Sequence, residues 1–163
     1  MINDRCNVII DKFNENMEAL GLDEIFRDDF LEYVQAKTDE YLEYGSDLYE
    51  YDNFIKDKVI KYLSDLYDNH KTYFYPTIDD EINELLASMN EQERKIYILT
   101  NHVIPFNISY QYDKKLLIKN FNIIEDNYDN VINNMMDKVT YYWDKHKMFG
   151  KINLSNLNTG TKK

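Results

Sequence analysis

The sequence predicts an all-α fold, an irregular bundle of six or seven helices with one short extended segment near residues 106–112. Apolar residues recur at steps of three and four through most of the 163 residues, which is the spacing of amphipathic helices. Only 4 Gly and 2 Pro punctuate the chain, fewer than a fold with many strands and turns needs. No run approaches the 18 apolar residues of a membrane-spanning helix, so we expect a soluble protein.

The first three helices are predicted from their apolar stripes and end signals. The stripe over residues 3–20 stops at Gly21, because glycine tolerates the left-handed conformation at a helix end. Asp23 is expected to cap a second helix that ends at Gly45. The third stripe, over residues 48–66, has the most regular spacing.

A boundary is expected where Pro76 interrupts the helical pattern. The residue before a proline avoids the α region of backbone space, so residues 73–77 are a candidate seam between two sub-bundles. No composition shift typical of a linker accompanies this boundary. We therefore predict a single helical domain over residues 1–150.

Four further helices are predicted beyond the seam. One starts near Thr77, and the next has Asn90 and Glu93 at the spacing of a capping box and ends at Pro105. Residues 106–112 then alternate between apolar and polar side chains, as in a strand. Because no partner strand is visible, we expect an extended connector packed across helices.

The last two helices are expected over residues 114–124 and 126–147, where apolar residues again recur at helical spacing. Residues 151–163 lack this period and end in two lysines. Chain ends without packed side chains fray unless something holds them, so we expect this segment to be a flexible or partner-held tail.

The charge is strongly acidic and unevenly distributed. The net charge is −11, with 24 acids and 10 bases in residues 1–100 but 6 acids and 9 lysines in residues 101–163. An acidic field repels nucleic acid and anionic membranes and attracts basic partners. We therefore expect a basic protein partner and no direct binding to nucleic acid or membrane. The basic end could also meet the acidic half of a second copy, giving a homo-oligomer.

No motif for catalysis, nucleotide binding or metal binding is present. The three histidines, His70, His102 and His146, lie far apart in sequence and have no cysteine partner at metal-ligand spacing. We interpret His146 as a histidine at the edge of the core, hydrogen-bonded to a neighbour. Cys6 lies on the apolar face of the first helix and is interpreted as a small buried hydrophobe. We expect no cofactor, no metal and no enzymatic activity.

Residue usage indicates the kind of genome that encodes the chain. It has 19 Asn, 17 Ile and 15 Tyr against 3 Ala and 4 Gly, the bias of AT-rich codons. A phage, a large DNA virus and a low-GC bacterium are all compatible sources. The N-terminus shows no basic region followed by an apolar stretch, so no secretory signal is visible. A cytoplasmic location, in the host cell if the gene is viral, is the expectation.

Tyrosines mixed with acids in the first half are the most informative pattern for function. Tyrosine offers a rigid apolar ring with a polar tip and is enriched at protein interfaces. Mixed with carboxylates, it suits the Arg- and Lys-rich grooves with which proteins hold nucleic acid. We therefore predict a non-enzymatic, virus- or mobile-element-encoded protein that docks a basic surface of a nucleic-acid-handling host protein and inhibits or regulates it. The predicted contact residues are Asp28, Asp29, Glu32, Asp39, Glu40, Glu43, Tyr44, Asp47 and Tyr49.

Other interpretations remain open at this point. The acidic half and the basic end could be complementary faces of a structural subunit in a larger assembly, such as a phage virion connector. An immunity protein or antitoxin with a basic toxin as partner is a variant of the first hypothesis. An acidic surface that only maintains solubility and an enzyme with buried carboxylates are further alternatives.

Overall fold

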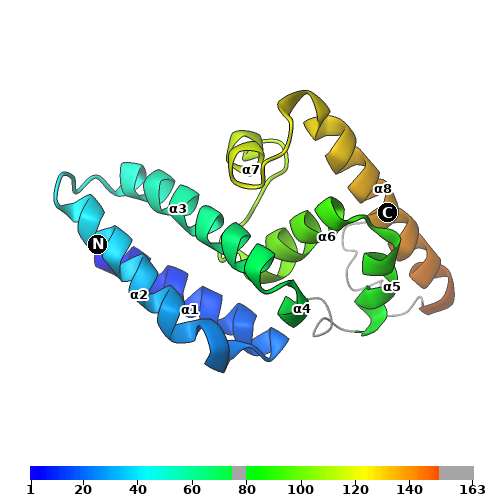
Figure 1. The fold of residues 1–163 in the computed structure, drawn as a ribbon, viewed down its shortest axis with the longest axis horizontal. Coiled ribbons are helices and arrows are strands. Elements are labelled where there is room, and N and C mark those ends of the chain that lie inside the picture. The colour runs from blue at the N-terminus through cyan, green and yellow to red at the C-terminus, as the bar shows by residue number, and fades with distance from the viewer. Residues whose placement is uncertain (75–79, 151–163) are drawn as a thin grey trace.

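The computed structural model describes residues 1–74 and 80–150, and this part of the chain is all-α, without strands (Figure 1). One α-helix, α4, has a single turn, and two short segments are a π-helix, η1, and a 3-10 helix, η2. The described elements are α1 (Ile2–Leu20), α2 (Asp23–Leu42), α3 (Leu48–Asn69), α4 (Lys71–Phe74), α5 (Asp80–Ser88), α6 (Glu91–Ile98), η1 (Leu99–Val103), α7 (Lys114–Asn120), η2 (Glu125–Asn127) and α8 (Tyr128–Gly150).

The connection between α1 and α2 is a tight turn at Gly21. Its φ of 74° is left-handed, and the backbone N–H of Leu22 donates to the carbonyl of Met17 at 2.8 Å, which closes the end of α1. The prediction that Asp23 caps α2 is wrong. Leu22 occupies the cap position without a side-chain hydrogen bond, while Asp23 is the first helical residue and pairs with Arg27 at 3.3 Å.

The core of the N-terminal part lies between α1, α2 and α3, which run side by side in Figure 1. Phe13 of α1 stacks on Phe30 of α2 with ring centroids 3.8 Å apart, and both side chains are fully buried. Cys6 is 4% exposed in the same core, which confirms its interpretation as a buried residue. Between α2 and α3, the hydroxyls of Thr38 and Tyr51 lie 2.7 Å apart.

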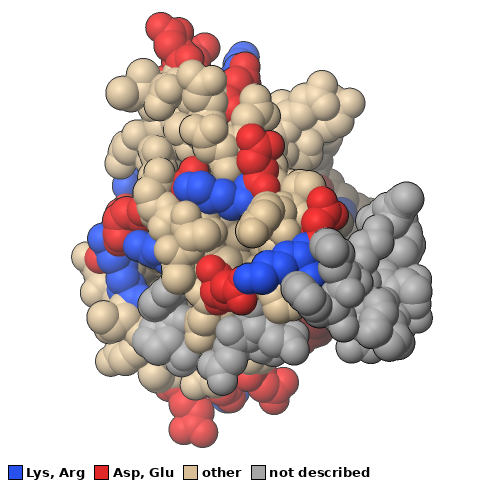
Figure 2. All heavy atoms as spheres, turned by 90° about the vertical axis from the view of Figure 1, so that its right-hand side faces the viewer, with Lys and Arg blue, Asp and Glu red and all other residues tan. Residues whose placement is uncertain are grey.

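The other end of the molecule is formed by α5, α6 and α8. The predicted capping box is confirmed, because the Asn90 and Glu93 side chains each accept a hydrogen bond from the other residue's backbone N–H. From α8, Lys138 pairs with Glu93 at 2.5 Å and Lys145 pairs with Glu84 of α5 at 2.7 Å. Figure 2 shows this end, where basic side chains lie among acidic ones.

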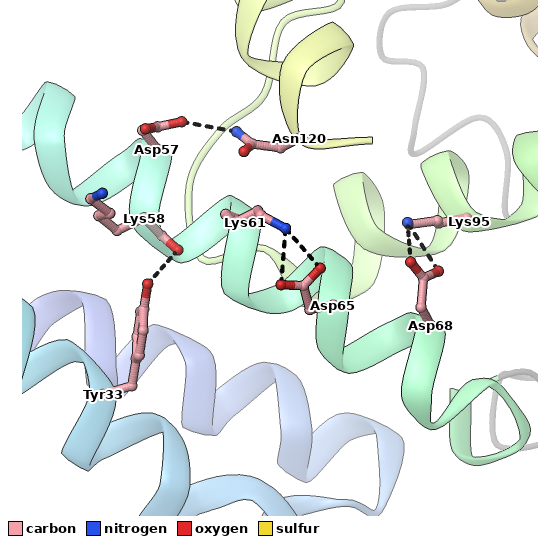
Figure 3. A network of polar contacts seen from close by, with 8 residues as sticks. All are labelled: Tyr33, Asp57, Lys58, Lys61, Asp65, Asp68, Lys95 and Asn120. Atoms are coloured by element: carbon pink, nitrogen blue, oxygen red, sulfur yellow. Dashed lines mark hydrogen bonds and ion pairs between the residues drawn. The ribbon is translucent and has the colours of Figure 1, made fainter. Parts of the chain in front are cut away.

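Helix α3 lies in the centre and makes polar contacts with three other helices (Figure 3). The Tyr33 hydroxyl of α2 donates to the carbonyl of Lys58 at 3.1 Å. Toward α7, Asp57 accepts hydrogen bonds from Lys119 and Asn120, both at 3.0 Å. Lys95 of α6 pairs with the Asp68 carboxylate of α3 at 3.0 Å. Lys56 of α3 pairs with Asp113, the residue just before α7, at 2.9 Å.

The predicted extended segment is shorter than expected. Residues 107–109 have no regular secondary structure, but residues 110–113 form a turn that leads into α7. The Ser109 hydroxyl accepts from the backbone N–H groups of Gln111 and Tyr112, which closes the turn. The hydrogen bonds to Ser109 therefore favour a turn at residues 110–113, where the alternating pattern had predicted an extended chain.

Some predictions fall outside the described residues or concern the membrane. Residues 75–79, which include most of the predicted seam and the expected helix start at Thr77, are not described, and neither is the predicted tail over 151–163. Within the described residues, none of the helices combines the length and the apolarity needed to cross a membrane.

Candidate protein-interaction surface

The predicted contact residues lie on the outward side of α2, at the connection from α2 to α3 and, for Tyr49, in the first turn of α3. All of them are exposed. Four of the acids, at positions 28, 32, 39 and 43, follow steps of four and seven, so they share one face of the helix. Two more acids flank this line. We call these six the acidic strip: Asp28, Asp29, Glu32, Asp39, Glu40 and Glu43.

The acidic strip faces away from the core because of the helical period. The apolar residues Phe26, Phe30, Val34 and Tyr41 are 0–6% exposed and lie on the side of α2 that packs against α1 and α3. At 100° per residue, the strip is centred nearly opposite to them. The amphipathic pattern that buries α2 therefore also aligns its carboxylates toward solvent.

Most of the strip has no partner within the described part of the chain. Glu40 pairs with Lys37 at 3.2 Å, whereas the other five carboxylates form no ion pair or side-chain hydrogen bond with described residues. Carboxylates near a helix C-terminus oppose the helix dipole, and the last turn of α2 contains no basic residue. The acids at positions 39, 40 and 43 are therefore placed where they lower the stability of the helix.

Asp47 has a structural role at the α2–α3 connection. Its Oδ1 accepts the backbone N–H of Glu50 at 2.9 Å and caps α3, while its carbonyl accepts the Tyr41 hydroxyl at 2.9 Å. Burial, together with the carboxylates of Glu50 and Asp47, raises the pKa of Tyr41, so this hydroxyl stays protonated as a donor. These two bonds hold the connection in place. They account for an aspartate at position 47 without a role in binding a partner protein.

The two predicted tyrosines are exposed beside this connection. Tyr44 is 68% exposed and Tyr49 is 75% exposed. The Tyr44 ring lies edge-on to that of Tyr41, with centroids 6.1 Å apart, and Tyr41 in turn packs against Tyr51 at 5.5 Å. An exposed ring supported by buried rings loses little side-chain freedom on binding, a property of interface anchors.

The sequence analysis missed one exposed apolar residue on the same face. Ile25 is 48% exposed and lies seven residues before Glu32, so it extends the line of the strip toward the N-terminus of α2. Its exposure could have been predicted from the sequence, because Ile25 directly precedes Phe26, where the buried stripe of α2 begins. A large apolar side chain next to the acids adds contact area to the surface.

Metal-ligating side chains do not cluster in the described residues. Groups of three or more His, Cys, Asp or Glu side chains that could hold a metal ion do not occur among them. His146 packs against Tyr142 with centroids 4.2 Å apart, as expected at the edge of the core. Its Nε2 is buried without a bonding partner in the described part and lies 3.9 Å from a carboxylate oxygen of Glu84, so this atom does not make the predicted hydrogen bond.

Comparison of the chain with protein-family models, with curated proteins and with solved structures found no match. The candidate surface therefore rests on the chemistry of its own residues.

Proposed function

We propose that this protein is a non-enzymatic interaction protein whose acidic strip and adjacent tyrosines dock a basic surface of a nucleic-acid-handling host protein. The observation that carries the proposal is the placement of the strip. Five of its six carboxylates have no cation among the described residues, and three stand at the helix end where they lower stability. Residues that violate a local rule without a structural gain are candidates for function.

The proposed mechanism separates steering from anchoring. Exposed carboxylates raise the rate at which a basic partner meets the surface, an effect that weakens with salt. Tyr44 and Tyr49 then provide contact area beside the strip. A basic groove occupied in this way is no longer open to phosphates, so the host protein is inhibited by competition. The AT-rich residue usage supports a viral or mobile-element origin and action in the host cytoplasm.

A charge-reversal variant tests the proposal. Changing Asp28, Glu32, Asp39 and Glu43 to Lys removes the central line of the strip and shifts the net charge from −11 to −3. The tagged variant and the natural chain are used to capture proteins from cells of the native host at ~0.1 M and ~1 M salt, where the Debye length is about 10 Å and 3 Å. We expect basic DNA- or RNA-handling proteins to bind the natural chain at low salt and to be recovered at least about tenfold less with the variant.

A matched control separates position from total charge. Reversing Asp11, Glu18, Glu125 and Asp144, which are exposed and form no ion pair with described residues, gives the same net charge at other sites. This control is expected to capture the same proteins as the natural chain. In a separate assay, the captured protein should release its nucleic acid when the purified natural chain is added. Equal recovery by both reversal variants contradicts the proposal, and recovery of capsid and tail proteins alone favours a virion subunit.

A further inference from the structure

A second surface feature, remote in sequence from the acidic strip, is a cleft of about 440 Å³ between α5, the start of α6 and α8. Helices α5 and α8 lie at the right-hand end of the molecule in Figure 1. Its polar and aromatic lining includes Glu84, Ser88, Glu93, Asp137, Lys138 and Tyr141. Three carboxylates and one ammonium group therefore line this space.

The buried carboxylate of Glu93 is the unusual group in the cleft. The residue is 2% exposed, and its Oε1 accepts both the backbone N–H of Asn90 at 2.9 Å and the ammonium of Lys138 at 2.5 Å. Its Oε2 accepts no hydrogen bond from the described residues. Oε2 is therefore an acceptor in the cleft lining that none of these residues occupies.

The rim of the cleft supplies a further charge and an aromatic face. Asp137 is exposed and forms no ion pair with described residues, whereas the Glu84 carboxylate is already paired with Lys145. Tyr141 is 70% exposed and lines the same space. Aromatic faces attract cations, and guanidinium groups in particular stack on them.

We propose that this cleft binds the guanidinium group of an arginine side chain presented by a partner. A guanidinium has five N–H donors in one plane, so it can donate to Oε2 of Glu93 and to Asp137 while its face covers Tyr141. An ammonium group has no plane to stack and is more strongly hydrated. The cleft and the acidic strip share no residues, so each proposal can be supported or contradicted without the other.

The test uses N-acetyl-arginine amide as the probe and the neutral citrulline derivative of the same shape as its comparison. Each is titrated at constant ionic strength into the ¹⁵N-labelled full-length protein, and amide shifts are followed by NMR. We expect saturable shifts around positions 88–93 and 134–142 with the arginine probe, and none with citrulline. The lysine derivative is expected to bind more weakly.

Variants on the rim test the contacts without disturbing the capping box. Asp137→Asn and Tyr141→Ala change exposed side chains, and each is expected to weaken arginine binding about two- to fivefold, the range of exposed ion pairs and cation–π contacts. Asp144→Asn is the matched control, because it removes an exposed charge from α8 outside the cleft lining. Reversal of the acidic strip should leave this binding unchanged.

Three outcomes would overturn the inference. Equal binding of the citrulline or lysine derivative contradicts recognition of a guanidinium. Shifts spread over all acidic surfaces, or an equal loss in Asp144→Asn, indicate nonspecific attraction to a chain of net charge −11. Unchanged affinity in both rim variants excludes the cleft as the binding site.

Discussion

At the residue scale, buried polar side chains differ in whether the fold provides a partner. Asn120 is 3% exposed and donates to Asp57, and Thr38 at 2% exposure shares a hydrogen bond with Tyr51. In contrast, Nε2 of His102 is buried without a hydrogen-bond partner in the described part of the chain. His102 belongs to the π-helix η1, and its ring lies edge-on to that of Tyr97 in α6, with the ring centroids 6.0 Å apart.

His102 gives the stability of the protein a dependence on pH. Burial lowers the pKa of His102 below 6.5, so the unfolded chain binds its proton more tightly than the folded protein. The free energy of unfolding therefore falls as pH decreases through about 6.5 and levels off below the folded pKa. His102→Phe keeps a ring beside Tyr97 and should reduce the stability difference between about pH 7.5 and 5.5, measured by urea unfolding.

Asp57 is not expected to mask this effect in that window. For Asp57, burial raises the pKa, but hydrogen bonds from Asn120 and Lys119 and the charge of Lys119 prevail and lower it below 3.8. Its contribution is present above about pH 4 and is lost only as pH falls through the lowered pKa. An unchanged pH dependence in His102→Phe would show that the imidazole is not the group that titrates.

At the scale of elements, α7 illustrates how a short helix is held by polar contacts. It has seven residues, too few for a stable isolated helix. It packs on α3, where Lys119 and Asn120 reach Asp57 and the adjacent Asp113 reaches Lys56. Because Asn120 is buried, its amide depends on Asp57 for its hydrogen bond.

Asp57→Ala should therefore loosen α7 and lower the free energy of unfolding by about 1–3 kcal/mol, since it leaves the buried amide of Asn120 unpaired. Asp65→Ala on the same helix is the matched control. It removes an exposed pair with Lys61 within α3 and should lower the free energy of unfolding by only about 0.3–0.5 kcal/mol. Urea unfolding measures both values, and hydrogen exchange of the α7 amides locates the effect. Equal losses in the two variants would contradict this role of Asp57.

At the scale of the whole molecule, the distribution of charge opposes stability in one place and supports it in another. Asp23 and Glu24 stand in the first turn of α2, where the helix dipole favours acids. The strip contains like charges four residues apart at 28 and 32 and again at 39 and 43, which repel each other. An acidic chain of this kind gains solubility and steering at the expense of some stability.

Neutralising the strip should therefore stabilise the protein. With Asp28→Asn, Glu32→Gln, Asp39→Asn and Glu43→Gln, we expect the free energy of unfolding at low salt to rise by about 0.5–1 kcal/mol, from two relieved repulsions and the helix dipole. The gain should shrink at ~1 M salt because of screening. Asp23→Asn with Glu24→Gln is the opposing control and should lower stability. A loss of stability on neutralising the strip would give its acids a structural role and weaken the proposed function.

The candidate surface could be predicted from the sequence because it depends on local periodicity. The line through 28, 32, 39 and 43 follows from the same spacing that buries Phe30 and Val34. The exposure of Tyr44 does not, because that spacing would place it on the buried face, three residues after Tyr41, had α2 not ended at Leu42. The structural role of Asp47 could have been read from its position before α3, since aspartate is a preferred helix cap. Its second contact, from Tyr41, depends on how the connection folds back.

The sequence by itself determined the helices, their main ends and their charged faces, because hydrophobic period, capping residues and charge act over a few residues along the chain. The tertiary structure alone decided which distant groups meet. Asp57 and Asn120 are 63 residues apart, and Lys138 reaches Glu93 across 45. Such pairs depend on how helices pack in three dimensions, and side-chain periodicity within one helix contains no information about its neighbour. The cleft between α5 and α8 therefore came only from the structure.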